Sequence, residues 1–424
     1  MYIKHILLLV FLLPVLIFSQ NYTLEELLDQ AMTTNSTLKQ SKINLDISRA
    51  RLHSAKVNFL PDLSAGMSHT EVLKYDDRYQ QLKADNDLQT GTDTAYLAVS
   101  KSIALNNVSY FANKDARHNY RLASISNEMQ FQNVVYSIIN SYITVLENQK
   151  RILLLQKNIE IQENIVSESN SLYRQTKITQ TQLQQSEINL LNARISLLNA
   201  QNTLNVNRKK LFDMINIEDE KRDFDEISMY ADDPAFAREL ETSQILRVRE
   251  HEETINKFRT AMTQTKLDFL PSLNLQYRYN RNFDIDNFEP DGVSTSHTVG
   301  LSLSYSLNGI FRNHFSYKVD KLLSAQNDLK TSDLIKDITL NYNQFTEELN
   351  YLKQLDILLD SRMVQAAENL AIARQRHKLG LETQLDLEKA IYENLEAEKA
   401  KEDNKYQLIR TKLNIDNLLS NRLY

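Results

Sequence analysis

The sequence predicts a mainly α-helical fold with a small β part. Long antiparallel helices are expected to form a trimeric α-barrel, and four strands per protomer are expected to contribute to a 12-stranded transmembrane β-barrel. The first supporting observation is a duplication, because residues 56–63 (KVNFLPDL) closely match residues 266–273 (KLDFLPSL). The second is that alternating residues follow the proline of each copy, which indicates strands. The third is that 424 residues contain only six Gly and five Pro, as very long helices require.

The alternation predicts strands over about 63–70, 95–105, 272–281 and 298–307. In the last two runs, apolar residues alternate with small or polar ones, which suits a strand between lipid and a watery lumen. An open sheet in lipid leaves backbone groups unpaired, each at a cost on the order of several kcal/mol. Pairing among three copies removes these edges and gives 12 strands. The apolar positions are Leu273, Leu275, Tyr277 and Tyr279 in one run, and Val299, Leu301, Leu303, Tyr305 and Leu307 in the other.

Helices are predicted for the remaining long segments. Thr23 to Glu26 reads as a capping box, with Thr23 as the N-cap and Glu26 reaching back to it. The helix that follows runs to about residue 59, with an interruption near Asn35. Apolar residues at spacings of three and four predict a coiled-coil seam at Ile188, Leu191, Ile195 and Leu198. The other helices are predicted over about 107–174, 180–213, 235–268, 315–377 and 382–419.

The order of these elements predicts two structural repeats behind a targeting segment. Residues 1–19 have a positive start at Lys4, an apolar stretch and a cleavage site after Ser19, which is typical of a signal peptide. The first repeat covers 20–215 and the second covers 235–424, each with a helix, a β-hairpin and a long helical hairpin. Pro61 and Pro271 mark the joints from helix to strand. The charge-dense segment 216–234 is interpreted as an acidic linker or an equatorial element.

Composition argues against several classes of function. The chain has no Cys, so disulfides and cysteine metal sites are excluded. A formal net charge of −6 argues against nucleic acid as a partner. The sequence has no glycine-rich phosphate loop, and His251-Glu252-Glu253 lacks the second histidine of a zinc-protease helix. We therefore expect no enzyme activity, no cofactor and no metal.

Four features together resemble the TolC-like outer membrane efflux proteins (outer membrane factors) over nearly the whole chain. They are Thr-Leu-Glu-Glu at 23–26, the two Phe-Leu-Pro joints, Leu-Ser-Leu-Ser-Tyr-Ser-Leu-Asn-Gly at 301–309, and Lys-Leu-Gly-Leu-Glu-Thr-Gln-Leu-Asp-Leu at 378–387. The resemblance implies a homotrimer in outer-membrane lipid, with its helical part in the periplasm. It implies a passive exit duct of a tripartite efflux pump or a type I secretion system. The implied partners are a periplasmic adaptor (membrane fusion) protein and an inner-membrane transporter.

The resemblance also points to a gate, because family members carry a ring of carboxylates near the periplasmic end of the second helical hairpin. Asp386 stands at the matching position, six residues after Gly380. The chain departs from the family three residues later, where Lys389 replaces a second acidic residue, and Glu388 lies on another helix face. His377 and Glu382 occupy positions where relatives carry the Tyr and Arg of the closed gate. The alternative for Asp386 is an ordinary exposed helix carboxylate.

The two helical bends are candidates for contact with the adaptor. Apolar residues at exposed bends are plausible docking points, and the alternative is that they pack against the neighbouring hairpin. Thr176 stands where the family prefers Gly, which leaves the geometry of the first bend open. The candidate docking residues are Thr176, Lys177 and Ile178 in the first bend, and Leu379, Gly380 and Leu381 in the second.

A second function class fits the same features. An outer-membrane-anchored coiled-coil structural or adhesive protein would use the strands merely as an anchor and place its helices outside the cell. A duct instead needs a water-filled helical tube with an adaptor-binding end in the periplasm. The exported substrate and the energy source of the pump are not encoded in any motif of the chain.

Overall fold

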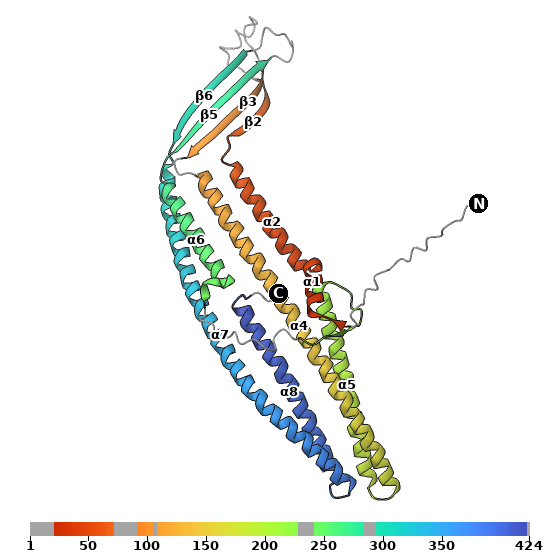
Figure 1. Cartoon of the computed structure of the whole chain (residues 1–424). Coiled ribbons are helices and arrows are strands. Elements are labelled where there is room, and N and C mark those ends of the chain that lie inside the picture. The colour runs from red at the N-terminus through yellow and green to blue at the C-terminus, as the bar shows by residue number, and fades with distance from the viewer. Residues whose placement is uncertain (1–20, 72–90, 105–107, 228–240, 284–293, 422–424) are drawn as a thin grey trace, which may run out of the picture. The chain divides into compact units, whose positions relative to one another are not determined.

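A computed structural model describes residues 21–71, 91–104, 108–227, 241–283 and 294–421. These residues form long α-helices and a small antiparallel sheet (Figure 1), so the predicted mainly α-helical class is confirmed. The predicted signal segment, 1–19, lies outside the described residues. None of the described helices combines the length and the apolarity that crossing a membrane requires.

The long helices and the four strands of the sheet follow one another in the order expected from the sequence. The two longest helices have 67 and 72 residues. Neither contains a proline, and their one glycine lies near the start of the 72-residue helix, so no helix-breaking residue interrupts them. The first half contains β1 (Asn21–Tyr22), α1 (Leu24–Thr34), α2 (Ser36–Val57), β2 (Asp62–Glu71), β3 (Gly91–Ala104), α4 (Val108–Arg174) and α5 (Gln180–Ile215). The second contains β4 (Asp223–Phe224), η2 (Thr242–Gln244), α6 (Leu246–Leu267), β5 (Ser272–Phe283), β6 (Ser294–Ser304), α7 (Leu307–Lys378) and α8 (Gln384–Leu418).

The predicted boundaries were wrong at two places in the second half. The helix expected from residue 235 begins at Leu246, after a 3-10 turn at 242–244, whereas 235–240 lie outside the described residues. The strand expected to reach residue 307 ends at Ser304, and α7 begins at Leu307 instead of 315. The reason for the second error is Ser306, whose hydroxyl accepts a hydrogen bond from the Gly309 amide at 3.2 Å. This cap starts a helix within a pattern that still alternates.

The start of the first helix confirms half of the predicted capping box. The Thr23 hydroxyl accepts a hydrogen bond from the Glu26 amide at 3.1 Å, as expected. The Glu26 carboxylate, however, pairs with Arg222 at 2.8 Å rather than with the amide of Thr23. The predicted interruption at Asn35 is confirmed, because its side-chain oxygen accepts from the Leu38 amide at 3.0 Å and thereby starts α2.

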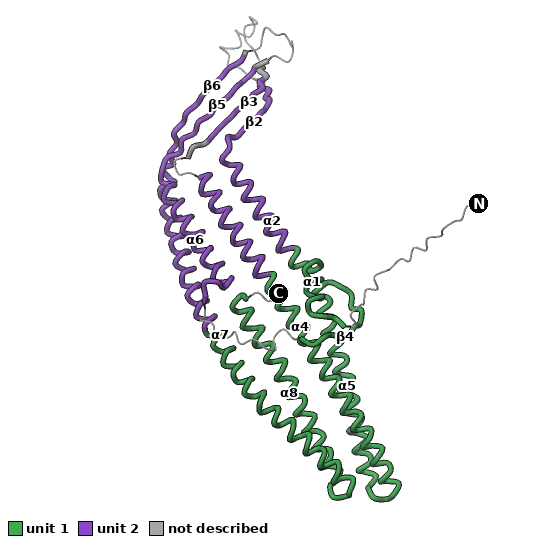
Figure 2. Tube along the Cα trace, viewed as in Figure 1, with its two compact units in different colours: residues 1–39, 131–240, 340–424 green, residues 40–130, 241–339 purple. Residues whose placement is uncertain are grey.

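The described residues fall into two compact units (Figure 2), each built from both halves of the chain. Unit 1 comprises 1–39, 131–240 and 340–424, and unit 2 comprises 40–130 and 241–339. The boundaries between the units cut through α2, α4 and α7. The predicted repeats 20–215 and 235–424, with 216–234 between them, describe order along the sequence and stay a prediction.

The main core lies in unit 1, where α1, α4, α5 and α8 meet two short strands. Tyr22 of β1 is 1% exposed and its ring packs 5.0 Å from Phe212 and 5.2 Å from Phe224 of β4. β1 and β4 pair in parallel. Burial alone would raise the pKa of Asp219, but hydrogen bonds from the Arg208 guanidinium at 2.6 and 2.8 Å hold it below its usual value. Residues from the acidic segment therefore belong to this core.

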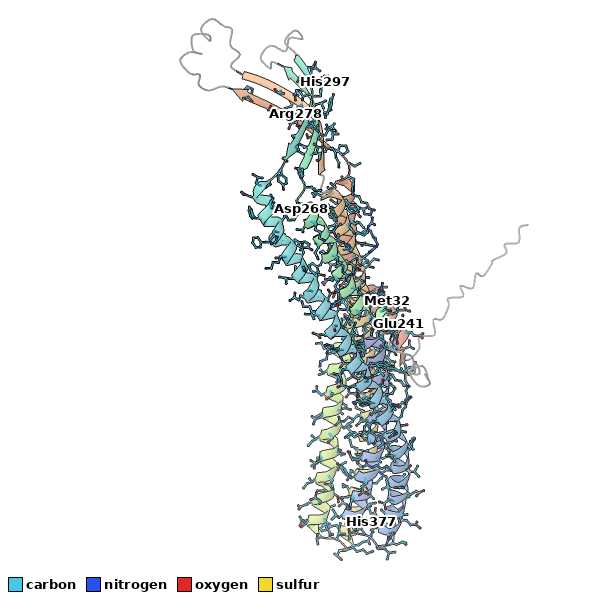
Figure 3. All side chains as sticks on the ribbon, turned by 90° about the vertical axis from the view of Figure 1, so that its left-hand side faces the viewer. Met32, Glu241, Asp268, Arg278, His297 and His377 are labelled. Atoms are coloured by element: carbon cyan, nitrogen blue, oxygen red, sulfur yellow. The ribbon has the colours of Figure 1, made fainter. Side chains whose placement is uncertain are left out.

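Unit 2 contains a four-stranded antiparallel sheet in the order β2-β3-β5-β6. Its register places Leu273, Leu275, Tyr277 and Tyr279 opposite Leu303, Leu301, Val299 and His297. Directly opposed residues point to the same face of an antiparallel sheet, so the predicted apolar face is confirmed for these positions. Tyr305 and Leu307 follow the strand and do not belong to it. Arg278 and His297, labelled in Figure 3, belong to different faces by the same register.

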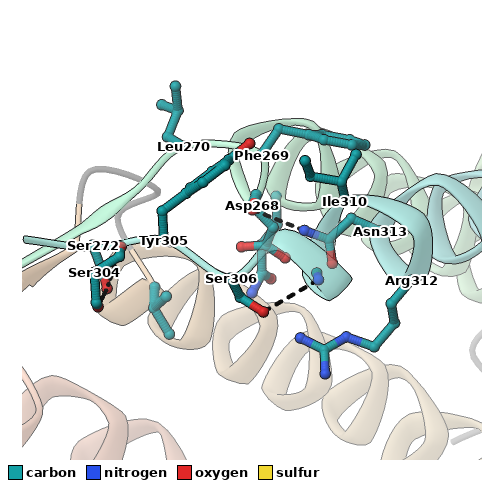
Figure 4. A pocket seen from close by; sticks show the side chains of 13 residues that line it. Asp268, Phe269, Leu270, Ser272, Ser304, Tyr305, Ser306, Ile310, Arg312 and Asn313 are labelled. Carbon is teal, nitrogen blue, oxygen red and sulfur yellow. Dashed lines mark hydrogen bonds between the residues drawn. The ribbon is translucent and has the colours of Figure 1, made fainter.

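At each of the two proline joints of unit 2, a side chain donates hydrogen bonds to carbonyl groups at the end of the preceding helix, and this side chain differs between the joints. Carbonyl groups at the end of a helix lack intrahelical partners. Before Pro61, the Lys101 ammonium donates to the carbonyls of Asn58 and Leu60 at 2.9 and 3.2 Å. Before Pro271, the Asn313 amide donates to the Asp268 carbonyl at 2.8 Å, beside a cavity of about 530 Å³ (Figure 4).

Candidate functional site

The first helical bend, between α4 and α5, is a tight turn around one residue with positive φ. Thr176 has φ 58°, and its amide donates to the Tyr173 carbonyl at 2.8 Å. The next amide, of Lys177, donates to the Leu172 carbonyl at 3.0 Å. These two bonds define a Schellman motif, which closes a helix at a left-handed residue. Thr176 therefore adopts the left-handed conformation that Gly usually adopts at the end of a helix. This answers the question about the geometry of the first bend that the sequence left open.

The second bend, between α7 and α8, repeats this arrangement. Gly380 has φ 69°, its amide donates to the His377 carbonyl at 2.9 Å, and Leu381 donates to the Arg376 carbonyl at 2.9 Å. Three residues after each left-handed residue comes a threonine N-cap, Thr179 in one bend and Thr383 in the other, and each closes a capping box. The two bends are therefore copies of one turn, differing in the residue with positive φ.

We expect Thr176→Gly to stabilise the protein by about 1 kcal/mol, because a β-branched residue with positive φ is strained. The reverse change, Gly380→Thr, should destabilise it by about 1–2 kcal/mol. No atom lies within 4 Å of a Cβ built on Gly380, so the effect comes from the backbone alone. Thermal unfolding of the purified variants measures both changes. A lower midpoint for Thr176→Gly than for the control Lys177→Gly would contradict the explanation.

The apolar residues of the bends differ in exposure. Leu379 and Leu381 are 67% and 68% exposed, whereas Ile178 is half-buried. Thr176 and Lys177 are exposed. Solvent-exposed leucines on a tight turn leave apolar surface for a partner, so the second bend offers more of it than the first.

The four gate candidates lie close to these bends but make different contacts. Asp386 is the third residue of the capping box, and its carboxylate accepts from the Thr383 hydroxyl at 2.5 Å and the Thr383 amide at 3.2 Å. These hydrogen bonds, from the hydroxyl first and the amide second, lower the pKa of Asp386. Glu388 instead accepts from Asn189 at 2.9 Å. It therefore connects α8 with α5, while Asp386 stays exposed.

Among the residues that the structure describes, His377 and Glu382 have different ion-pair partners and are not paired with each other. His377 Nδ1 lies 3.7 Å from the Glu168 carboxylate of α4 and lines a cavity of about 480 Å³ between α4, α7 and α8. Glu382 lies 3.9 Å from Arg376 of its own hairpin. The first residue thus faces the other hairpin, and the second faces its own.

A buried polar cluster joins the two hairpins, and no sequence motif predicted it. Ser169 and Ser186 are 1% and 0% exposed, and their hydroxyls lie 3.1 Å apart. Gln384 completes the cluster, because its amide nitrogen donates to Ser186 at 2.8 Å and its oxygen accepts from Ser169 at 3.1 Å. Apolar residues of α4, α7 and α8 pack beside it: Ile165, Leu370, Ala373, Leu387, Ala390 and Ile391.

Within each unit the helices lie in a row, and the helices at the two ends of the row carry exposed apolar side chains. In unit 1, hydrogen bonds and ion pairs join α7 to α8, α8 to α4, and α4 to α5, and near the bends α8 also bonds to α5. In unit 2, they join α2 to α4, α4 to α6, and α6 to α7. The exposed residues of unit 1 are Ile188, Leu191, Ile195 and Leu198 of α5, and Tyr351, Ile357, Leu358, Val364 and Ile372 of α7. Those of unit 2 include Ile43, Ile47 and Val57 of α2, and Leu307, Phe311, Phe315, Val319 and Leu322 of α7.

Residues 239–421 match the family model described as outer membrane efflux protein. Among solved structures, the chain resembles the CmeC outer membrane channel of Campylobacter jejuni, with 14% identity, 94% of this chain and 85% of that one covered, and a TM-score of 0.84. It also resembles the outer membrane protein VceC of Vibrio cholerae, with 15% identity, coverage of 93% and 95%, and a TM-score of 0.80. The MtrE outer membrane channel of Neisseria gonorrhoeae follows, with 15% identity, coverage of 93% and 88%, and a TM-score of 0.74. No curated protein matches the sequence. At these identities the likeness shows a shared fold.

Proposed function

We propose that this chain forms an outer membrane efflux channel, a passive exit duct across the periplasm and the outer membrane, because residues 239–421 match the family model described as outer membrane efflux protein. The observation that carries the proposal is the sheet of unit 2. One of its faces is mainly apolar, the other is polar, and its outer strands β2 and β6 each have one side without a partner in the sheet. A sheet of this kind can stand in lipid only if its edges are paired.

The exposed apolar stripes on the outer helices support a ring made of several copies of the chain. An exposed stripe on α7 and a different exposed stripe on α5 or α2 can meet between two chains in a head-to-tail contact, and such contacts form a ring when the rotation between copies closes. Four strands are too few to enclose a channel, and three copies give a barrel of 12. We therefore propose a homotrimer in which β6 of one protomer pairs with β2 of the next and the helices form an α-barrel in the periplasm.

The two bends are the proposed docking points for a periplasmic adaptor protein, with an inner-membrane transporter supplying the energy. Leu379 and Leu381 present the larger apolar surface, and Thr176, Lys177, Ile178 and Gly380 complete the two turns. For the constriction we propose Asp386, which is exposed and charged. Glu388, His377 and the buried serine–glutamine cluster would hold the two hairpins together in the closed state, with Glu382 held by Arg376.

The native mass of the protein, extracted in mild detergent from the outer-membrane fraction, tests the proposal. We expect three protomer masses. Recovery as a monomer, or as a soluble periplasmic protein, would contradict the shared barrel and leave the coiled-coil structural or adhesive function as the better explanation. That alternative would also place the bends outside the cell, where an added protease could reach them.

A further inference from the structure

The polar face of the sheet has almost no charge. Register pairs place the even-numbered residues of all four strands on this face. Among the described strand residues, Asp62 and Arg278 are the only charged side chains there, and Asp62 is the first residue of β2. The remaining positions carry Ser, Thr, Asn, Gln, Gly, Ala and one Tyr. A single cation therefore dominates the electrostatics of the middle of this face.

The side chain of Tyr96 lies next to the guanidinium of Arg278. The guanidinium carbon lies 5.3 Å from the centroid of the Tyr96 ring, within the range of a cation–π interaction. Tyr96 is opposite Gly66, where an added Cβ would lie 2.7 Å from the ring. Ala98, opposite Arg278, is 3% exposed. Two small residues thus make room for two large side chains that lie across the strands.

No carboxylate lies within ion-pair distance of Arg278 in the part of the chain that the structure describes. Arginine keeps its charge at every physiological pH. Tyr96 fixes the position of the guanidinium without neutralising it, because a ring attracts a cation through its quadrupole and carries no net charge. The arrangement keeps one positive charge in place and available to solutes on this face.

We propose that Arg278, positioned by Tyr96 above Gly66, forms a basic ring that makes the strand-lined part of the duct favour anionic over cationic solutes. This rests on the proposed function, in which the polar face lines the lumen and threefold symmetry repeats the charge. A ring of like charges in a narrow pore concentrates counter-ions and repels ions of its own sign. Salt screens such an effect, since the Debye length falls from about 10 Å at 0.1 M to about 3 Å at 1 M.

A single cysteine tests the proposal locally, because the chain contains no other. Thr298 is opposite Arg278 on the same face, so Thr298→Cys places a thiol beside the guanidinium. The modification rates of this thiol by an anionic sulfonatoethyl and a cationic trimethylammonioethyl methanethiosulfonate are compared in outer-membrane vesicles. We expect the anionic-to-cationic rate ratio to fall roughly three- to tenfold when Arg278→Gln is added, and to be retained in Arg278→Lys.

Arg281→Gln is the matched control, because it removes an equal charge from the same strand but from the opposite face, where Arg281 pairs with Ala95 and Thr295. An unchanged ratio in Arg278→Gln, or an equal fall in Arg281→Gln, would overturn the basic ring. If neither reagent modifies the Thr298→Cys variant in the assembled protein, the polar face does not line a lumen and the proposed function fails instead. Should Arg278→Gln not assemble, the ratio in Thr298→Cys alone must still fall as salt rises from about 0.1 M to about 1 M. A ratio that does not depend on salt would overturn the ring.

Discussion

Glutamate at both Leu191 and Leu198 is expected to leave the chain folded but monomeric. Both leucines belong to the exposed stripe of α5 and are 56% and 67% exposed in the protomer, so the substitution disturbs no core packing. In the proposed trimer the same positions are covered by the α7 stripe of a neighbouring copy. Burying an unpaired carboxylate there costs several kcal/mol for each site. This cost is larger than the stabilisation that the two buried leucine side chains would supply. The native mass in mild detergent should therefore fall from three protomers to one.

Ser196→Glu is the control for this change. Ser196 is also exposed on α5 but lies on another face of the helix, about a third of a turn from the stripe. It should keep the trimer, and circular dichroism should show the same helical content in both variants. A trimer that survives Leu191→Glu/Leu198→Glu would show that the α5 stripe faces solvent or a different partner, and the proposed order of helices around the tube would be wrong.

The α5 stripe illustrates what an apolar pattern can and cannot predict. The spacing of Ile188, Leu191, Ile195 and Leu198 predicted a coiled-coil seam, but the side of α5 that packs within the protomer carries Ser186, Ala193 and Ala200. These residues are seven apart and small, which lets neighbouring helices approach closely. Periodicity reveals that a helix face is apolar; it does not tell whether the partner belongs to the same chain.

The sheet and the long helices were predictable because they depend on strong local signals. Proline after α2 and α6, alternation in the strands and the near absence of breakers elsewhere predicted most element boundaries to within a few residues. The start of α7 was missed because one serine hydroxyl, that of Ser306, decides between strand and helix. A cap of this kind is visible in a sequence only when the following residues stop alternating.

The candidate site was predictable only in part. Resemblance to relatives pointed to the bends and to Asp386, and the structure adds the contacts of these residues. The cluster of Ser169, Ser186 and Gln384 could not be found from the sequence, because its members are common polar residues 17 and 198 positions apart. Nor could the Tyr96–Arg278 contact, which depends on the register between β3 and β5.

Replacing Asp386 with Gln is expected to remove a cation preference at the proposed constriction while leaving the bend intact. The twin bend shows why the fold should tolerate the change. There Gln182 fills the same position of the capping box, and its side-chain oxygen accepts from the Thr179 amide at 2.8 Å and the Thr179 hydroxyl at 3.1 Å. Asp386→Gln thus recreates a cap that the chain already uses. The thermal midpoint should stay the same, and the cation-to-anion permeability ratio in planar bilayers should fall roughly three- to tenfold.

The pH dependence of the same ratio separates Asp386 from other acids. Hydrogen bonds from Thr383 lower the pKa of Asp386, so its carboxylate stays charged as the pH falls to about 4, the usual range for Asp. A lowered pKa in the folded protein also means that the stability contributed by this carboxylate is present above the pKa of the unfolded chain. That contribution is lost only as the pH falls through the lower folded value. The cation preference of the unaltered protein should therefore persist down to about pH 4, whereas Asp386→Gln should keep its lower cation-to-anion ratio at every pH in that window.

Glu187→Gln is the matched control for Asp386→Gln, because it removes one exposed carboxylate near the same end of the molecule from the first hairpin instead of the second. If the ring lies on α8, only Asp386→Gln changes the permeability ratio. Equal changes in both variants would mean that the charge around the mouth is diffuse and that Asp386 is an ordinary helix carboxylate. Because the cap is kept in both variants, either result reports on charge and not on a disordered bend.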